Sequence, residues 1–243
     1  MSIWINDSKI ERNILNALVN VEDDTSRFLE DYGSHEVPLT GSFIIILKYQ
    51  LEPLKREIEE WAAKEFKGNA IVNLDYEDIA SKGLEKDYGA DFGFHLIINI
   101  DDHLYSERGL LVQAKNPRFK SDDSEQLWEI NRPQLSVLMC RSPFSVYFLY
   151  GLNKTDVKIR VIPASYVKNI LNKTGKKSIS PKNIKSFSRK FSNFFLYDFI
   201  GNWWGDTDES VLNIVRGTDD LVKVRHIFRI EISVKKEEKD NKN

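Results

Sequence analysis

The chain has 243 residues, of which 41% are hydrophobic and 30% are charged, and its formal net charge at pH 7 is -2. This length allows one large domain with a substantial core, and these fractions are ordinary for a globular protein. A net charge this close to zero indicates no particular class of partner, so the local distribution of charge becomes the informative quantity.

The cysteine content and the length of the apolar runs indicate the cellular compartment. The single cysteine, Cys140, excludes an intrachain disulfide and fits a reducing environment. The sequence begins without a basic segment followed by an apolar one, so we expect no signal peptide. No apolar run approaches the ~20 residues that cross a bilayer. We therefore expect a cytoplasmic protein that does not contact a membrane.

The first part of the chain predicts helices. Residues 1–38 are acidic and helical in pieces, with Asp7 or Ser8 placed to cap a helix. Residues 54–66 repeat apolar side chains at helical spacing, and Pro53 suits the first turn of that helix.

The middle and end of the chain predict strands that alternate with helices. Expected strands cover residues 70–75, 91–100, 109–115, 144–150, 158–163 and 226–234. Expected helices cover residues 123–139 (with a break at Pro133), 165–170, 187–200 and 209–216. The order helix, strand, strand, strand, helix, strand in the middle predicts an α/β fold with a mixed central sheet flanked by helices.

Polar residues stand at the ends of two neighbouring predicted strands. Asp91 begins one apolar strand, and Gln113 and Lys115 end the next. Residues two apart on a strand share a face, so Gln113 and Lys115 point the same way. An acid, an amide and an ammonium are therefore expected at one end of the sheet.

The turn between these strands sets the register. With an antiparallel hairpin turning near residues 101–108, the numbers of opposite residues sum to about 206. Asp91 then faces Lys115, and Gln113 faces Gly93, which leaves room for the amide because it has no side chain.

These residues resemble the PD-(D/E)xK nuclease superfamily, which has the restriction-endonuclease-like fold. The likeness covers roughly residues 50–152 and is carried by Glu57 on a helix, the segment from Glu85 to Asp91, and Gln113-Ala-Lys115 with the helix and strand that follow. It looks closest to the branch with Gln in place of the acid before x-Lys, as in Mrr-like restriction enzymes.

The resemblance implies a metal ion and roles for five residues. It implies that Asp91, Gln113 and Glu57 bind Mg²⁺, with Mn²⁺ as a substitute, and that Lys115 positions the attacking water. Glu85 would orient Asp91 or bind a second ion. From the residues alone, a solvated helix face for Glu57, a loop acid for Glu85 and an edge-strand residue for Gln113 stay open as alternatives.

The sequence departs from the family pattern at two places. Asp91 is not preceded by proline, and Asn116 follows Lys115 where the family often has arginine. Gln113 in place of an acid, together with Asn116, leaves open a scaffold that binds nucleic acid without cutting it.

The expected elements and the resemblance divide the chain into four parts. We expect an N-terminal helical segment at 1–49 packed on the core, and a nuclease-like α/β core at 50–164. A basic and aromatic C-terminal elaboration of the same domain follows at 165–234. A disordered tail at 235–243 has no apolar residues.

A long basic stretch predicts nucleic-acid binding. Between Asp156 and Asp198 there is no acidic residue, whereas ten lysines and arginines lie in that interval. Phosphate backbones attract such surfaces, so DNA is the expected partner, with RNA not excluded. The alternative is a lysine-rich loop that maintains solubility. The residues assigned to this contact are Lys176, Lys177, Lys182, Lys185, Arg189 and Lys190.

Aromatic residues follow the basic stretch, partly at helical spacing. They are best explained as core or as the face of a homodimer, and base stacking is the second explanation. The group is Phe187, Phe191, Phe194, Phe195, Tyr197, Phe199, Trp203 and Trp204.

Together these features predict a Mg²⁺-dependent (endo)deoxyribonuclease, with a role in restriction or phage (antiviral) defence by fold-level analogy. A catalytically inactive nucleic-acid-binding module on the same scaffold is one alternative. An interaction protein that oligomerises through its aromatic region is the other.

Overall fold

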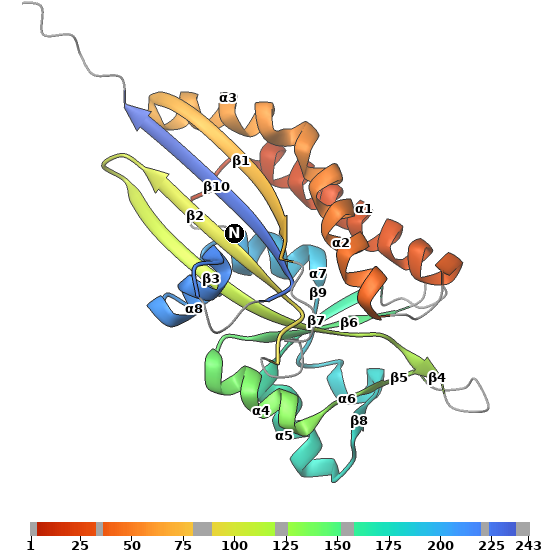
Figure 1. Ribbon diagram of the computed structural model, residues 1–243. Helices are drawn as coiled ribbons and strands as arrows, with labels where there is room; N and C mark the ends of the chain where they lie inside the picture. The colour runs from red at the N-terminus through yellow and green to blue at the C-terminus, as the bar shows by residue number, and fades with distance from the viewer. Residues whose placement is uncertain are drawn as a thin grey trace, which may run out of the picture.

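The computed structural model has a mixed α/β fold with helices on both faces of a seven-stranded central sheet (Figure 1). This confirms the predicted fold class at that level. The structure describes residues 4–32, 36–79, 89–119, 126–151, 158–219 and 224–236.

The helices, in chain order, are α1 (Ser8–Tyr32), α2 (Glu36–Leu51), the 3₁₀ turn η1 (Glu52–Leu54), α3 (Lys55–Phe66), α4 (Arg132–Arg141), α5 (Ala164–Thr174), α6 (Pro181–Ile184), α7 (Phe191–Asn193), the π-helix η3 (Phe194–Ile200) and α8 (Glu209–Arg216). The strands are β1 (Gly68–Asp78), β2 (Phe92–Ile100), β3 (Leu104–Lys115), β4 (Arg118–Phe119), β5 (Gln126–Glu129), β6 (Val146–Tyr150), β7 (Ile159–Pro163), β8 (Ser178–Ile179), β9 (Arg189–Lys190) and β10 (His226–Lys236).

The central sheet has the strand order β1-β10-β2-β3-β6-β7-β9. Strand β10 runs parallel to β2 and β6 runs parallel to β3, while the other neighbours are antiparallel. A small second sheet has the order β4-β5-β8. Strand β10 therefore lies between β1 and β2 inside the central sheet. The sequence predicted this strand but not its neighbours, because alternation identifies a strand without specifying its partners.

Each face of the sheet has its own core. Phe94 and Phe148 pack on one face with side chains from α1, α2 and η3, while Leu111 and Tyr147 pack on the other with side chains from α4, α5 and α8. This division follows from the alternation of side chains along each strand. Helices α1 and α2 pack on the first face.

Much of the aromatic group belongs to the first core, as one of the two explanations predicted. The buried members are Phe191, Phe194, Phe195 and Phe199. Trp203, in contrast, is 64% exposed.

The segment predicted as a helix with a break at Pro133, residues 123–139, contains a strand followed by a shorter helix. Strand β5 ends at Glu129, and α4 begins at Arg132 with Pro133 in its first turn. Asn131 caps α4 by accepting a hydrogen bond from the backbone N–H of Gln134 at 3.2 Å. Proline and a capping asparagine favour a helix start here rather than a continuous helix.

No helix in the described ranges combines the length and the apolar character that crossing a bilayer requires. The predicted tail mostly falls outside the described residues, since β10 continues to Lys236 and residues 237–243 are not described.

Candidate functional site

The β2–β3 hairpin sets the geometry of the candidate site. Ile100 pairs with Leu104 and Phe92 pairs with Val112, so the predicted register was wrong by two residues. The turn occupies only residues 101–103, where Asp102 adopts a left-handed backbone with φ of 61°. Aspartate tolerates this conformation better than most residues, which permits the shorter turn.

A shift of two residues preserves the face on which each side chain lies. Gly93 pairs with Leu111 instead of Gln113, and Asp91 comes level with Gln113 instead of Lys115. The expected group of polar side chains thus stays on one face of the sheet, and its internal contacts change.

Asp91 holds the ends of the two strands together. Its backbone N–H donates to the carbonyl of Val112 at 2.8 Å. Its Oδ2 atom accepts hydrogen bonds from the Gln113 side-chain amide and from the backbone N–H of Ala114, the latter at 2.7 Å. The carboxylate is therefore fixed directly against Gln113.

Two buried oxygens at this position have no hydrogen-bond partner among the described residues. They are Oε1 of Gln113, a residue that is 1% exposed, and the hydroxyl of Tyr147, which pairs with Gln113 across β3 and β6. Burial, followed by the charge of Asp91, raises the pKa of Tyr147, so its hydroxyl stays protonated. An unsatisfied buried polar group costs about 1–3 kcal/mol, so this pair of oxygens calls for a bound cation or water.

Glycine brings Asp91 close to α4. Gly89 has φ of 75°, and a Cβ atom there would lie 2.6 Å from the carbonyl oxygen of Gln134 and 2.7 Å from the nitrogen of Leu138. Only glycine allows the chain to approach the helix this closely. The site therefore lies between the end of the hairpin and the first turns of α4.

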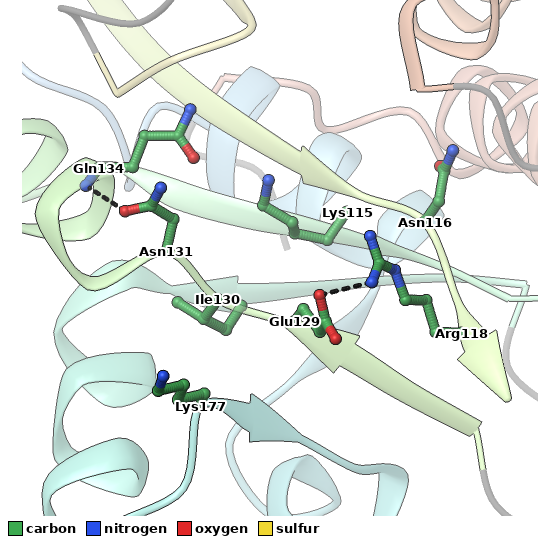
Figure 2. Close-up of a pocket in the computed structure, with 8 residues that line it drawn as sticks. All are labelled: Lys115, Asn116, Arg118, Glu129, Ile130, Asn131, Gln134 and Lys177. Atoms are coloured by element: carbon green, nitrogen blue, oxygen red, sulfur yellow. Dashed lines mark hydrogen bonds and ion pairs between the residues drawn. The ribbon is translucent and has the colours of Figure 1, made fainter. Parts of the chain in front are cut away.

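Lys115 ends β3 on the same face and lines a pocket of about 380 Å³. The residue is buried, with 8% of its surface exposed. Figure 2 shows its side chain between the α4 side of the pocket and an ion pair on the opposite side. Its other polar neighbours in the pocket include Arg118, Glu129, Asn131, Gln134 and Lys177.

The structure does not bring Glu57 to this group. Glu57 accepts a hydrogen bond from Asn13 at 2.8 Å and forms an ion pair with Lys9 at 2.8 Å, and both bonds lower its pKa, that of Lys9 most. Helix α3 packs on β1 and contributes to the first core, whereas Asp91 shares the face of the second. Strand β10 also separates β1 from β2, so α3 and α4 lie at opposite ends of the view in Figure 1.

The remaining predicted ligand, Glu85, falls outside the described residues. Within the described ranges, no group of three or more His, Cys, Asp or Glu side chains could hold a metal ion. Asp91 and Gln113 supply a carboxylate and an amide oxygen, the types of donor that Mg²⁺ or Mn²⁺ prefers, and such ions need only one or two carboxylates with water and phosphate. In this structure the Gln113 nitrogen, and not its oxygen, faces Asp91.

All six predicted nucleic-acid-binding residues are exposed. Lys177 lines the pocket that contains Lys115, a connection that no local sequence pattern signals. Lys182 lies on α6, and Lys185 follows that helix. Lys176 lies in the connection between α5 and β8, and Lys190 lies on β9. Arg189 donates to both carboxylate oxygens of Asp198 at 2.6 Å, which reduces its capacity to bind phosphate.

Sequence reasoning missed Arg118, Glu129, Asn131, Gln134 and Tyr147 as residues of this region. Each lies on an ordinary strand or helix end, and none belongs to a motif. Only the approach of β3, β4, β5, β6 and α4 groups them.

Comparisons with protein-family models, with curated proteins and with solved structures find no match to this chain.

Proposed function

We propose that this chain is a divalent-metal-dependent nuclease that hydrolyses phosphodiester bonds of DNA on a restriction-endonuclease-like core. One observation carries the proposal. Asp91 contacts Gln113 at the end of a hairpin, the Gln113 carbonyl is buried without a hydrogen-bond partner among the described residues, and Lys115 follows on the same face.

The order of elements supports the proposed core. Helix α3 precedes β1, β2 and β3, and α4 then leads to β6, which runs parallel to β3. The sequence anticipated this succession, and β10 is an addition between β1 and β2.

In the proposed reaction, Asp91 and Oε1 of Gln113 would hold Mg²⁺ or Mn²⁺. The bound ion would polarise a phosphate oxygen and lower the pKa of a coordinated water. The Gln113 amide nitrogen donates to Asp91 in this structure, so the amide would have to rotate to bring Oε1 to the ion. The Lys115 ammonium aligns the attacking water and offsets the negative charge that develops on the phosphate.

Burial strengthens these interactions. Gln113 and Lys115 are almost fully enclosed, and the surrounding side chains of the second core keep bulk water away. Charges interact more strongly in such surroundings than in water. The exposed lysines between 176 and 190 would bind the DNA backbone, with an affinity that falls as salt rises.

Plasmid nicking tests the proposal. Wild-type protein should nick plasmid DNA with Mg²⁺ or Mn²⁺ and not with EDTA, and Asp91→Ala or Lys115→Ala should reduce the rate by about 10³-fold. Glu57→Ala is the matched control, because it removes an acid that the structure places on α3, and its rate should stay at the wild-type level. Nicking that persists in EDTA, or in folded Asp91→Ala and Lys115→Ala proteins, would end the proposal.

A second candidate is a module that binds nucleic acid without cutting it. It is favoured by the Gln113 amide, whose nitrogen rather than oxygen faces Asp91. A salt-dependent gel shift, with no cleavage in Mg²⁺, Mn²⁺, Co²⁺ or Ca²⁺, would select this candidate.

The oligomerisation candidate has less surface to use, because four of its eight aromatic residues are buried in the chain's own core. Sedimentation at micromolar concentration would test it. A role in restriction or phage defence rests on fold-level analogy alone.

A further inference from the structure

We infer that the pocket beside Lys115 is a binding subsite for one phosphate of the DNA strand, next to the phosphodiester that reacts. This inference rests on the proposed function and adds to it a defined contact for the substrate backbone. Three cationic side chains carry it, namely Lys115, Arg118 and Lys177.

The three cations reach the pocket from separate segments. Lys115 ends β3, Arg118 lies on β4, and Lys177 follows α5. Lys115 is 8% exposed and forms the inner wall, whereas Arg118 and Lys177 are exposed at the rim (Figure 2). A volume of about 380 Å³ is ample for a phosphate group.

The pocket contains one carboxylate, among its described lining residues, against these three cations. Glu129 forms an ion pair with Arg118 at 2.7 Å, and the two side chains are 59% and 70% exposed. An exposed pair of this kind is weak, so Arg118 can exchange Glu129 for a phosphate at little cost. The net positive charge favours an anion, and arginine is well suited to phosphate because its guanidinium donates two parallel hydrogen bonds.

Helix α4 adds favourable polar groups. Its first turn faces the pocket through Asn131 and Gln134, and a helix N-terminus favours a nearby anion. Oδ1 of Asn131 caps the helix, so its amide nitrogen can donate to a ligand.

The rim segment with Lys177 is held in place by the backbone. The carbonyl of Lys177 accepts a hydrogen bond from the N–H of Ile130 at 2.9 Å. Next to it, Glu129 pairs with Ser178 in the β5–β8 ladder. Arg132 also donates to the carbonyl of Lys176 at 3.3 Å. Ordered backbone on both sides of the pocket limits the entropy lost when a phosphate binds.

Lys115 connects this pocket to the proposed catalytic group. Its neighbour Ala114 donates to Asp91, and its ammonium is assigned to the reacting phosphate. A phosphate between Arg118 and Lys177 would therefore lie beside the scissile group. A DNA strand presents such a series of phosphates, so the occupant is a neighbouring phosphodiester of the same strand.

Binding of a short DNA duplex in EDTA, measured by fluorescence anisotropy over a range of salt concentrations, tests this inference without requiring cleavage. Arg118→Ala and Lys177→Ala should each weaken binding about five-fold and reduce the slope of log affinity against log salt by about 1. Glu129→Gln should act in the opposite direction and strengthen binding, because it removes the competing carboxylate. Lys64→Ala, which removes an equal charge on α3, should match wild type.

The outcomes separate this inference from the proposed function. Wild-type slopes in Arg118→Ala and Lys177→Ala, or weaker binding in Glu129→Gln, would overturn the subsite even if the protein cuts DNA. Reduced slopes in a protein that never cuts would support the subsite and reject the nuclease. Absence of any DNA binding at low salt would overturn both.

Discussion

Two polar clusters lie on the same face of the β2–β3 hairpin, and they differ in how fully their hydrogen bonds are satisfied. In the mid-sheet cluster, Nε2 of His95 lies 2.7 Å from Glu107, and Arg229 donates to Nδ1 of His95 at 3.1 Å. Arg216 donates to both oxygens of Glu107 at 2.7 Å. At the end of the hairpin, the oxygens of Gln113 and Tyr147 have no hydrogen-bond partner among the described residues.

The comparison separates a cluster that stabilises the fold from the cluster that we propose as a ligand site. A satisfied buried network rigidifies a core, and unsatisfied buried groups in a native protein require an explanation such as an ion or water. The mid-sheet cluster joins β2, β3, β10 and α8 within the chain. At the end of the hairpin, Lys115 lines a pocket together with Arg118 and Lys177.

The hydrogen bonds of the mid-sheet cluster also set the protonation states of Glu107 and His95. Donation from Arg216, followed by that from His95, lowers the pKa of Glu107 to about 2. Burial lowers the pKa of His95. Because Arg229 donates to Nδ1, His95 is neutral with its proton on Nε2, from which it donates to Glu107. The mid-sheet cluster is thus built from an ionised carboxylate and a neutral imidazole.

The largest expected effect lies in the mid-sheet cluster. Glu107→Ala should lower the free energy of unfolding by about 3–5 kcal/mol, because Arg216 and His95 lose their shared partner in a mostly buried position. Urea unfolding measures this change. Glu209 is the matched control, since it also binds Arg216 but its side chain is 68% exposed, and Glu209→Ala should cost at most about 1 kcal/mol. Equal costs would show that the mid-sheet network is not a special source of stability.

Gln113→Glu tests whether the cluster at the end of the hairpin binds a divalent ion. Without a divalent ion, the new carboxylate should destabilise the protein by about 2 kcal/mol, because it is buried against Asp91 and cannot donate to it. Mg²⁺ should restore stability, since two carboxylates bind the ion more strongly than one. Thermal unfolding with and without Mg²⁺ measures both effects, and Gln113→Met, which adds no oxygen, is the control. A variant indifferent to Mg²⁺ would contradict the metal site.

The pH dependence of stability tests the mid-sheet cluster. His95 has a lowered pKa in the folded state, so the unfolded chain binds its proton first as pH falls below about 6.5. Below that pH, the free energy of unfolding should therefore decline by up to about 1.4 kcal/mol per pH unit. The stabilisation that the ionised Glu107 provides should be lost at lower pH, as pH falls from about 4.5 towards 2. His95→Gln should remove the first decline, and His103→Gln, at an exposed turn position, should keep it. Urea midpoints from pH 5 to pH 7 decide between these results.

The smallest expected effect concerns the Tyr147 hydroxyl. Tyr147→Phe should leave stability unchanged or raise it by up to about 1 kcal/mol, because the hydroxyl lost has no hydrogen-bond partner among the described residues. Tyr76→Phe is the contrasting variant, since the hydroxyl of Tyr76 lies 2.9 Å from Nδ1 of His226, and it should lose about 1 kcal/mol. A clear loss of stability in Tyr147→Phe would show that this hydroxyl is satisfied in solution.

Much of the local structure could be predicted from the sequence. Strands β2, β6 and β7 lie within a residue or two of the predicted ranges, because continuous apolar segments bounded by turn residues are a local signal. The shared face of Gln113 and Lys115 was equally predictable, because it needs only the alternation of a strand. The helix expected at 123–139 was wrong only in its first part, where residues 126–129 form strand β5 because they pair with β4 and β8, while α4 occupies the second part.

The arrangement of the candidate site depended on longer-range structure. Because the turn has three residues instead of the predicted eight, Asp91 lies opposite Gln113 and not opposite Lys115. Because β10 pairs with β2, it lies between that strand and β1, on which α3 packs, so Glu57 is far from Asp91 and Gln113. Lys177 and Lys115 share a pocket only because β8 pairs with β5. The sequence by itself determined which polar side chains end the two strands and which way they alternate, because these properties are local to each strand. The tertiary structure decided which of them meet, because pairing between distant segments depends on loop closure and packing over the whole chain.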